Sequence, residues 1–257
     1  MKLIALDSSG LTASVAVVED DILTAEYTVQ YKKTHSQTLL PMLDEISRMI
    51  ELDLDTVDAV AVAAGPGSFT GLRIGSATAK GLAFALHKPI VPVPTVDGLA
   101  YNMYGTDKKV CPIMDARRNQ VYTGIYEFVL MPVSLNSSFQ RSYELHCLKE
   151  QCAVAFVDIA EELNSIGREV IFLGDGVPVF AEQMKDVMKV PYSLAPAHMN
   201  RQRAASIGVL GSIYYVQGKY ESGEEHAPVY LRLSQAEREA RQKEKALGKE
   251  TGQEAQS

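Results

Sequence analysis

The stretch Gly65-Pro66-Gly67-Ser68-Phe69-Thr70-Gly71-Leu72-Arg73-Ile74-Gly75 lies between an apolar run, 57–64, and a segment of low charge, 74–86. This order predicts a strand, a glycine-rich turn and a helix. Glycines allow close backbone approach, and the first N–H groups of a helix are unpaired, so a phosphate or a carboxylate could bind there. The stretch matches neither GxxxxGK[ST] nor a clean GxGxxG. A turn that only packs the helix on its sheet is an equal alternative.

The helix predicted over 71–86 carries only two full charges, Arg73 and Lys80, seven residues apart. A helix that is apolar on nearly all sides must be buried on nearly all sides. Small residues recur at every fourth position of this helix: Gly71, Gly75, Ala79 and Ala83. Two interpretations are open. The helix packs on its own sheet alone, or it is shared between that sheet and a second protein chain.

Composition limits the class of protein. The chain has 257 residues, of which 46% are hydrophobic, enough for two domains of ordinary size. A formal charge of −7 argues against sequence-independent binding of nucleic acid over a broad surface. Cys111, Cys147 and Cys152 have no metal-binding spacing and leave an odd thiol, which favours a reducing compartment. The N-terminal apolar run is too short for a signal peptide, and no run is long enough to span a membrane, so we expect a cytoplasmic protein.

The order of elements predicts two similar units. Strands are expected at 3–6, 14–18, 22–29, 57–64 and 90–93, with helices at 34–50, 71–86 and 95–104. The second half is expected to contain strands at 110–114, 121–128 and 170–173, helices at 156–163 and 201–218, and turns at 115–120 and 174–176. From Ser234 the chain is polar and has no aromatic residue, which predicts a solvated helix fraying into disorder. The predicted domains are 1–104, 105–233 and a tail, 234–257.

A hairpin set leading into a sheet with crossover helices, present twice, resembles the actin-like ATPase superfamily. The predicted fold class is therefore α/β, with two actin-like (ribonuclease H-like) lobes, each a mixed sheet with an antiparallel hairpin set and flanking helices. In that superfamily two turns face each other across a nucleotide cleft, and here they would be 7–10 and 115–118. Asp7 could help to hold a metal-bound phosphate, or it caps its own turn. The candidate anion or cleft contacts are Asp7, Ser8, Gly67, Ser68, Asp115, Arg117, Arg118, Gly174, Asp175 and Gly176.

Several motifs in one order resemble the TsaB (YeaZ) family of tRNA threonylcarbamoyladenosine biosynthesis proteins, over about residues 1–232. They are His35-Ser36-Gln37 with Leu39-Leu40-Pro41, the stretch 65–75 with 79–83, Asp115-Ala116-Arg117-Arg118 with Val121-Tyr122, Gly174-Asp175-Gly176 and Pro228-Val229-Tyr230-Leu231-Arg232. The resemblance implies a partner of TsaD and of the ATPase TsaE. Together these proteins transfer threonylcarbamoyl from its adenylate to the exocyclic amine of the adenosine beside the anticodon, in tRNAs reading ANN codons. The tRNA would be reached indirectly, through the complex.

The resemblance also implies that this subunit is not the catalyst. TsaD holds its metal with a His-x-x-x-His helix, and the matching positions here are Thr95 and Leu99. Leucine has no lone pair to donate, and a threonine hydroxyl is a poor ligand for a transition metal. None of the five histidines forms an i,i+4 pair. We therefore expect no metal and no cofactor in this subunit, with ATP and metal in the partner subunits.

The predicted helices 34–50 and 71–86 are the expected interface, because in the family they form a four-helix bundle with the equivalent pair of TsaD. The same face could make a homodimer of the isolated chain, and the sequence leaves open whether it does. The candidate interface residues are Leu40, Met42, Leu43, Met49, Arg73, Ile74, Gly75, Ala77, Ala79, Lys80, Ala83 and Phe84. Two other functions are alternatives. A peptidase would need a metal site, or a nucleophile with a histidine, and an actin-like kinase would need Asp7, Gly67 and the turn 174–176 to converge on a nucleotide.

Overall fold

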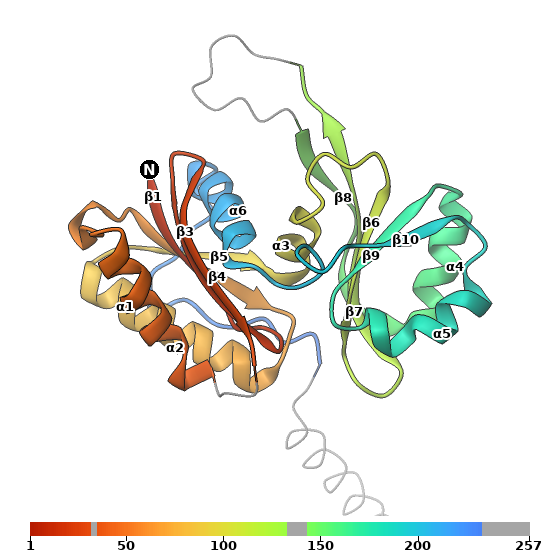
Figure 1. Cartoon of the computed structure of the whole chain (residues 1–257), viewed down its shortest axis with the longest axis horizontal. Helices are drawn as coiled ribbons and strands as arrows, with labels where there is room; N and C mark the ends of the chain where they lie inside the picture. Colours follow the sequence, from red (N-terminus) through yellow and green to blue (C-terminus); the bar gives the residue numbers. More distant parts are fainter. Residues whose placement is uncertain (32–34, 133–142, 233–257) are drawn as a thin grey trace, which may run out of the picture.

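The computed structural model describes residues 1–31, 35–132 and 143–232, so the predicted tail, 234–257, lies outside the described residues. These residues form two five-stranded mixed sheets with helices on their faces (Figure 1). The predicted fold class, with two lobes that each contain a mixed sheet, an antiparallel hairpin set and flanking helices, is confirmed.

The sheet of the first lobe has the strand order β3-β2-β1-β4-β5. Its strands are β1 (Lys2–Asp7), β2 (Thr12–Glu19), β3 (Ile22–Gln30), β4 (Ala59–Gly65) and β5 (Ile90–Pro94). The first three strands pair antiparallel, whereas β4 and β5 continue the sheet in parallel from β1. All of β4 and nearly all of β1 and β2 are buried, since both faces of the sheet are covered.

Two pairs of helices cover the two faces of this sheet. On one face, α1 (Leu39–Met49) and α2 (Phe69–Leu86) pack on Ile4 and Leu6. On the other face, α3 (Thr95–Tyr101) and α6 (Ala204–Val216) pack on Leu3 and Ala5. Alternate residues of β1 therefore enter two different cores. Two 3-10 turns, η1 (His35–Gln37) and η2 (Leu54–Thr56), complete this lobe, and α1 begins after Thr38, later than the predicted start at 34.

Helix α6 lies within 105–233, the range expected to form the second lobe, yet it packs on the first sheet. Two glycines of α6 explain why it packs on this sheet. A Cβ at Gly208 would meet the Val18 side chain at 2.6 Å, and one at Gly211 would meet Ala61 at 2.7 Å. The two glycines let the helix lie close to β2 and β4, where its apolar surface is buried.

The sheet of the second lobe has the order β10-β9-β6-β7-β8. Its strands are β6 (Lys109–Asp115), β7 (Gln120–Leu130), β8 (Tyr143–Ala155), β9 (Val170–Leu173) and β10 (Tyr192–Leu194), and its helices are α4 (Phe156–Ile166) and α5 (Val177–Val187). The sequence did not predict β8, β10 or α5. The strands β8 and β10 lie at the two edges of the sheet and contain no buried residue. Their sequences therefore lack the apolar pattern from which a strand is predicted.

Helices α3 and α6 lie between the two sheets and join the lobes (Figure 1). One core cluster contains Leu99 of α3, Ile207 of α6 and Tyr126 of β7. At its polar edge the hydroxyl of Tyr126 donates to Asp97 Oδ1 at 2.7 Å, and that of Tyr214 donates to Oδ2 at 3.0 Å. Among the helices of the described residues, none is both long and apolar enough to cross a bilayer.

The small-residue stripe of α2 faces its own sheet. A Cβ at Gly71 would lie 2.1 Å from the Ser8 carbonyl oxygen, and one at Gly75 would lie 2.5 Å from Ser8 Oγ. Ala79 and Ala83 are buried in the same core. The stripe therefore packs on the parent sheet, and the expected interface role of Gly75, Ala79 and Ala83 is wrong. Met42 and Leu43 of α1 are buried in this core too, because they lie on the face of α1 that covers the sheet.

We predict that replacement by alanine has opposite effects on the stability of the protein at two glycines of α2, Gly71 and Gly81. Gly71→Ala should destabilise the protein by about 1–3 kcal/mol, because its methyl group would clash with the Ser8 backbone. Gly81→Ala is the control: nothing lies within 4 Å of its added Cβ, and alanine favours the helix by about 0.5–1 kcal/mol. Urea unfolding of both variants measures the difference. Equal effects of the two substitutions would contradict the close packing of α2 on the turn at Ser8.

Candidate functional site

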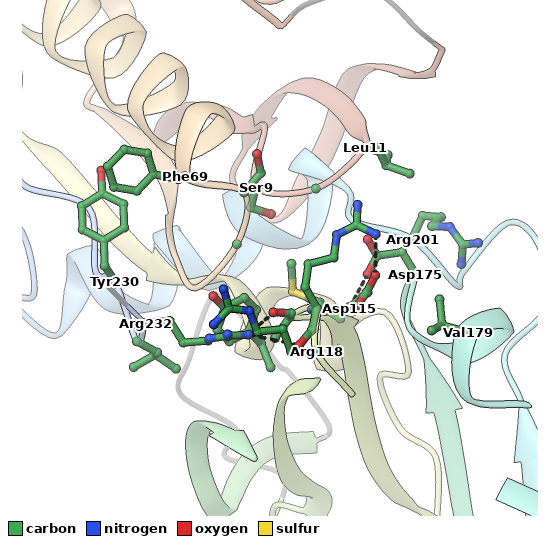
Figure 2. A pocket seen from close by; sticks show the side chains of 18 of the residues that line it. Ser9, Leu11, Phe69, Asp115, Arg118, Asp175, Val179, Arg201, Tyr230 and Arg232 are labelled. Carbon is green, nitrogen blue, oxygen red and sulfur yellow. Dashed lines mark hydrogen bonds and ion pairs between the residues drawn. The ribbon is translucent and has the colours of Figure 1, made fainter. Parts of the chain in front are cut away.

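A cavity of about 730 Å³ opens between the two lobes (Figure 2). The first lobe contributes Ser9, Gly10, Leu11, Gln30, His35, Gly67, Ser68 and Phe69. The turns of the second lobe contribute Met114, Asp115, Ala116, Arg117, Arg118, Tyr122, Asp175, Pro178 and Val179. The segment before α6 contributes Arg201, and the last described residues contribute Val229, Tyr230, Leu231 and Arg232. The cavity thus collects residues that are distant in sequence.

In the first lobe, the turn 7–10 and the glycine-rich turn are bonded to each other. The Ser68 N–H donates to the Ser9 carbonyl at 2.7 Å, and Ser8 Oγ donates to the Gly71 carbonyl at 2.9 Å. Ser68 also caps α2, because its Oγ accepts from the Gly71 N–H at 3.2 Å. Two backbone N–H groups that could have bound an anion therefore have partners within the protein. This geometry favours the packing interpretation of the glycine-rich turn.

Asp7 is buried and caps its own turn. Its Oδ1 accepts from the Ser9 N–H at 2.9 Å and from Ser9 Oγ at 2.6 Å. Burial raises the pKa of this carboxyl to about 6, although the hydrogen bonds from Ser9 act in the opposite direction. Neither Asp7 nor the buried Ser8 lines the cavity, so their expected role as cleft contacts is wrong, whereas Gly67 and Ser68 do line it.

In the second lobe, Asp115 organises the turn that follows β6. Its Oδ1 accepts from the Arg117 N–H at 2.7 Å, and its Oδ2 pairs with Arg117 Nη1 at 3.0 Å. Arg117, Arg118 and Asn119 have φ of +63°, +57° and +57°, a left-handed conformation that non-glycine residues seldom adopt. A strained turn thus presents the exposed Arg117 and Arg118 at the cavity.

The turn 174–176 lies against the same strand. Gly174 has φ of +109°, and a Cβ there would lie 2.1 Å from the Ile113 carbonyl oxygen, which also accepts from the Gly176 N–H at 3.0 Å. The two glycines therefore set the close approach of this turn to β6 and do not line the cavity, whereas Asp175 does. Asp175 Oδ1 accepts from the Asp115 N–H at 3.2 Å, and burial raises the pKa of Asp175 although Arg201 lowers it.

Two arginines of the cavity were missed by sequence reasoning. Arg201 Nη1 donates to the carbonyls of Gly174 at 3.0 Å and Asn200 at 2.9 Å, and its buried Nε has no partner among the described residues. Arg232 donates to the carbonyls of Ala116 and Arg117. Arg232 belongs to the motif at 228–232, which predicted family membership but no role. Arg201 had no signal in the sequence, because its place depends on the folding of distant segments.

We call Val229–Arg232 the strap, since it connects the lobes. The Val229 N–H donates to the Ala64 carbonyl in the first lobe at 2.7 Å, while Arg232 bonds the turn of the second lobe. Tyr230 packs on Phe69, with ring centroids 4.8 Å apart, and the Arg73 guanidinium lies 3.9 Å above the Phe69 ring. The strap is thus anchored to the start of α2 and forms one wall of the cavity.

The cavity carries a positive charge although the whole chain has a formal charge of −7. Four arginines line it, Arg117, Arg118, Arg201 and Arg232, against two carboxylates, Asp115 and Asp175. Arg117 is paired with Asp115, and Asp175 accepts a backbone hydrogen bond. Guanidinium groups bind phosphate and carboxylate well, so the site is suited to an anion.

The positions that matched metal ligands of TsaD have other roles here. Thr95 Oγ1 accepts from the Gly65 N–H at 3.1 Å, and Leu99 is buried between the lobes. Within residues 1–31, 35–132 and 143–232, no group of three or more histidine, cysteine, aspartate or glutamate side chains could hold a metal ion.

The outer faces of α1 and α2 carry the remaining candidate interface residues. Large apolar side chains are exposed there: Leu40 at 52%, Met49 at 76% and Phe84 at 82%. Arg73 and Ala77 are also exposed, whereas Ile74 and Lys80 are half-buried. An apolar surface therefore remains on these helices, but it is narrower than the sequence suggested.

Comparisons with known proteins agree on one family. The family model described as TsaD: tRNA N6-adenosine threonylcarbamoyltransferase matches residues 24–240. A Bacillus subtilis (strain 168) protein named tRNA threonylcarbamoyladenosine biosynthesis protein TsaB is 31% identical over 239 residues, which cover 92% of this chain and 96% of that protein. The protein of the same name from Escherichia coli (strain K12) is 27% identical over 237 residues, which cover 90% of this chain and 95% of that protein.

A solved structure supports the same assignment. It is the crystal structure of an uncharacterized protein with similarity to peptidase YEAZ from Pseudomonas aeruginosa, and it matches with a TM-score of 0.74 and 27% identity. The match covers 90% of this chain and 99% of that chain.

We predict that Asp7→Asn stabilises the protein at neutral pH. A carboxyl with a higher pKa in the folded state binds protons more readily when folded, so its contribution to stability is lost as the pH rises from 3.8 through about 6. Asparagine keeps an acceptor for Ser9 and carries no charge. The gain should be about 3 kcal/mol at pH 7.5 and close to zero at pH 4. Denaturant unfolding of both proteins at the two pH values measures it, and a gain independent of pH would contradict the role of the buried charge.

Proposed function

Because the chain belongs to the TsaB branch of the TsaD family, we propose that it is a non-catalytic subunit required for threonylcarbamoyl transfer to tRNA. The acceptor would be the N6 amine of the adenosine beside the anticodon in tRNAs reading ANN codons. The observation that carries this proposal is the match to a TsaB protein over 92% of this chain and 96% of the relative. The proposed location is the cytoplasm, where such tRNAs are modified.

The residues at the positions of the TsaD metal ligands support the non-catalytic role. Thr95 uses its hydroxyl to accept the Gly65 N–H, and Leu99 fills the core between the lobes, so neither is placed as a ligand. In this proposal TsaD supplies the metal and the transfer chemistry, and TsaE supplies ATP hydrolysis. The chain contributes a scaffold that activates TsaD.

The exposed faces of α1 and α2 are the proposed partner surface. Exposed large apolar side chains are a common mark of a protein interface, and here Leu40 and Met49 of α1 and Phe84 of α2 are exposed. The equivalent helices of TsaD would complete a four-helix bundle, with Arg73 and Lys80 at its edge. In the absence of TsaD, the same face would join two copies of this chain. The tRNA would be reached through the complex.

Omission of single subunits tests the function. We expect threonylcarbamoyl transfer to tRNA when this chain, TsaD and TsaE are combined, and loss of transfer when this chain alone is left out. Radiolabelled threonine incorporated into tRNA is the measurement. Undiminished transfer without this chain would overturn the proposal, as would peptide hydrolysis or small-molecule phosphorylation by the chain alone.

Phe84→Glu tests the partner surface. Its side chain is 82% exposed, so the variant should fold normally, but burial of an unpaired charge in a bundle should weaken TsaD binding about a hundredfold or more. Val216→Glu is the matched control, because Val216 is 76% exposed at the end of α6, away from α1 and α2. Calorimetric titration with TsaD compares the two variants. Equal affinity of the two variants for TsaD would show that the interface lies away from Phe84.

A further inference from the structure

We propose that two copies of this chain associate by antiparallel pairing of their β3 strands, across a two-fold axis that makes the sheets of the two first lobes continuous. The partner at this edge is therefore a second copy of the chain. The inference goes beyond the proposed function and does not rest on it, because β3 is not part of the surface of α1 and α2 proposed to bind TsaD.

Strand β3 is an open edge of the first sheet. It stands at the end of the strand order and, among residues 1–31, 35–132 and 143–232, it pairs with β2 alone. In the same residues, no backbone hydrogen bond joins β3 to a loop or a turn. The N–H and C=O groups on the outer side of β3 are therefore available to another strand.

The other three sheet edges carry features that hinder such pairing. β5 contains Pro92 and Pro94, and its Ile90 already exchanges two backbone hydrogen bonds of 2.9 Å with Glu221. β10 has only three residues. β8 is long, but charged or titratable side chains are spaced along it: Glu144, His146, Lys149 and Glu150. Proline, short length and charge are the usual protections of an edge strand, so each of these three edges is protected.

Strand β3 lacks these protections over residues 25–30. The bulge of the strand lies at Thr24, so the stretch 25–30 pairs regularly with β2. This stretch contains no proline, glycine, lysine or arginine. Its one charged residue, Glu26, is bound inward, because Arg203 Nε donates to Oε2 at 3.1 Å and the Ala205 N–H donates to Oε1 at 3.1 Å. The stretch therefore presents a regular edge with no unpaired charge.

The stretch 25–30 is complementary to itself in an antiparallel pair. Alternate side chains form an apolar set on the face of the sheet that α1 covers and a polar set on the face that α6 covers. The apolar set is Ala25, Tyr27 and Val29, and the polar set is Glu26, Thr28 and Gln30. Residues that lie opposite each other in such a pair are on the same face, so apolar side chains would meet apolar ones and polar side chains would meet polar ones.

Two registers of this pair have the longest overlap, and both keep Glu26 away from its own copy. With the two-fold axis at Tyr27, Glu26 faces Thr28. With the axis at Thr28, Glu26 faces Gln30. An axis at Glu26 would place two carboxylates opposite each other, which is destabilising. In both favoured registers the two Tyr27 side chains, each 42% exposed in the single chain, lie directly or diagonally opposite each other.

Sedimentation velocity of the full chain tests the proposal. All variants carry Phe84→Glu, which removes the face proposed to join two copies through α1 and α2. We expect the Phe84→Glu chain to be dimeric, and addition of Tyr27→Lys to weaken the dimer about tenfold or more, because like charges would meet across the axis. Ile22→Lys is the matched control. Ile22 is 67% exposed on the same strand but lies before the bulge, so the dimer should persist.

An exchange of charge at Tyr27 separates a lost interface from a misfolded variant. The Tyr27→Lys chain and a Tyr27→Glu chain should each be monomeric alone, and an equimolar mixture of the two should form dimers, because opposite charges then face each other. A monomeric Phe84→Glu chain would overturn the pairing of β3, as would equal dimer dissociation constants of the Tyr27→Lys and Ile22→Lys variants, or a mixture that stays monomeric. None of these measurements involves TsaD or tRNA, so failure of this proposal and failure of the proposed function are distinguishable.

Discussion

The arrangement of the first lobe depends on the contact between the turn 7–10 and the glycine-rich turn. The Ser68 N–H donates to the Ser9 carbonyl at 2.7 Å, and a Cβ at Gly67 or Gly71 would meet a backbone oxygen at 2.3 or 2.1 Å. Because no side chain separates the turns, α2 begins directly above β1, and its small residues lie on the sheet. The opposite face of α2 is left exposed, and Phe84 lies on it near the C-terminal end of the helix. One backbone contact therefore fixes both the buried and the exposed side of the helix.

Sequence patterns predicted the fold best where local signals and packing coincide. The apolar runs at β1 and β4 and the turn at 65–71 identified the first lobe, because strands buried on both faces lack polar residues. Edge strands such as β8 have no such signal, and α6 was placed with the wrong sheet because periodicity does not reveal which surface a helix covers. The small residues Gly75, Ala79 and Ala83 were expected at a partner interface for the same reason, because their spacing does not reveal which surface they contact.

The candidate site was only partly predictable. Asp115, Arg117, Arg118 and Asp175 line the cavity as the sequence indicated, since turns that follow central strands meet at one edge of a sheet. Asp7 does not line the cavity, because two hydrogen bonds from Ser9 hold its carboxylate inside its own turn. Arg201 and Arg232 reach the cavity from segments whose position is set by tertiary contacts. Such residues have no spacing relation to the turns that they meet.

The place of α6 has a consequence for synthesis on the ribosome. The face of the first sheet that contains Leu3 and Ala5 is covered by α6, whose residues follow β1 by about two hundred positions along the chain. While a ribosome is still adding residues before 204, that face has no helix from the C-terminal part to cover it. The core on this face of the first lobe is thus completed only after almost the whole chain has emerged, although all five strands of the sheet lie within residues 2–94. Chaperones that bind apolar nascent segments would meet this face before α6 does.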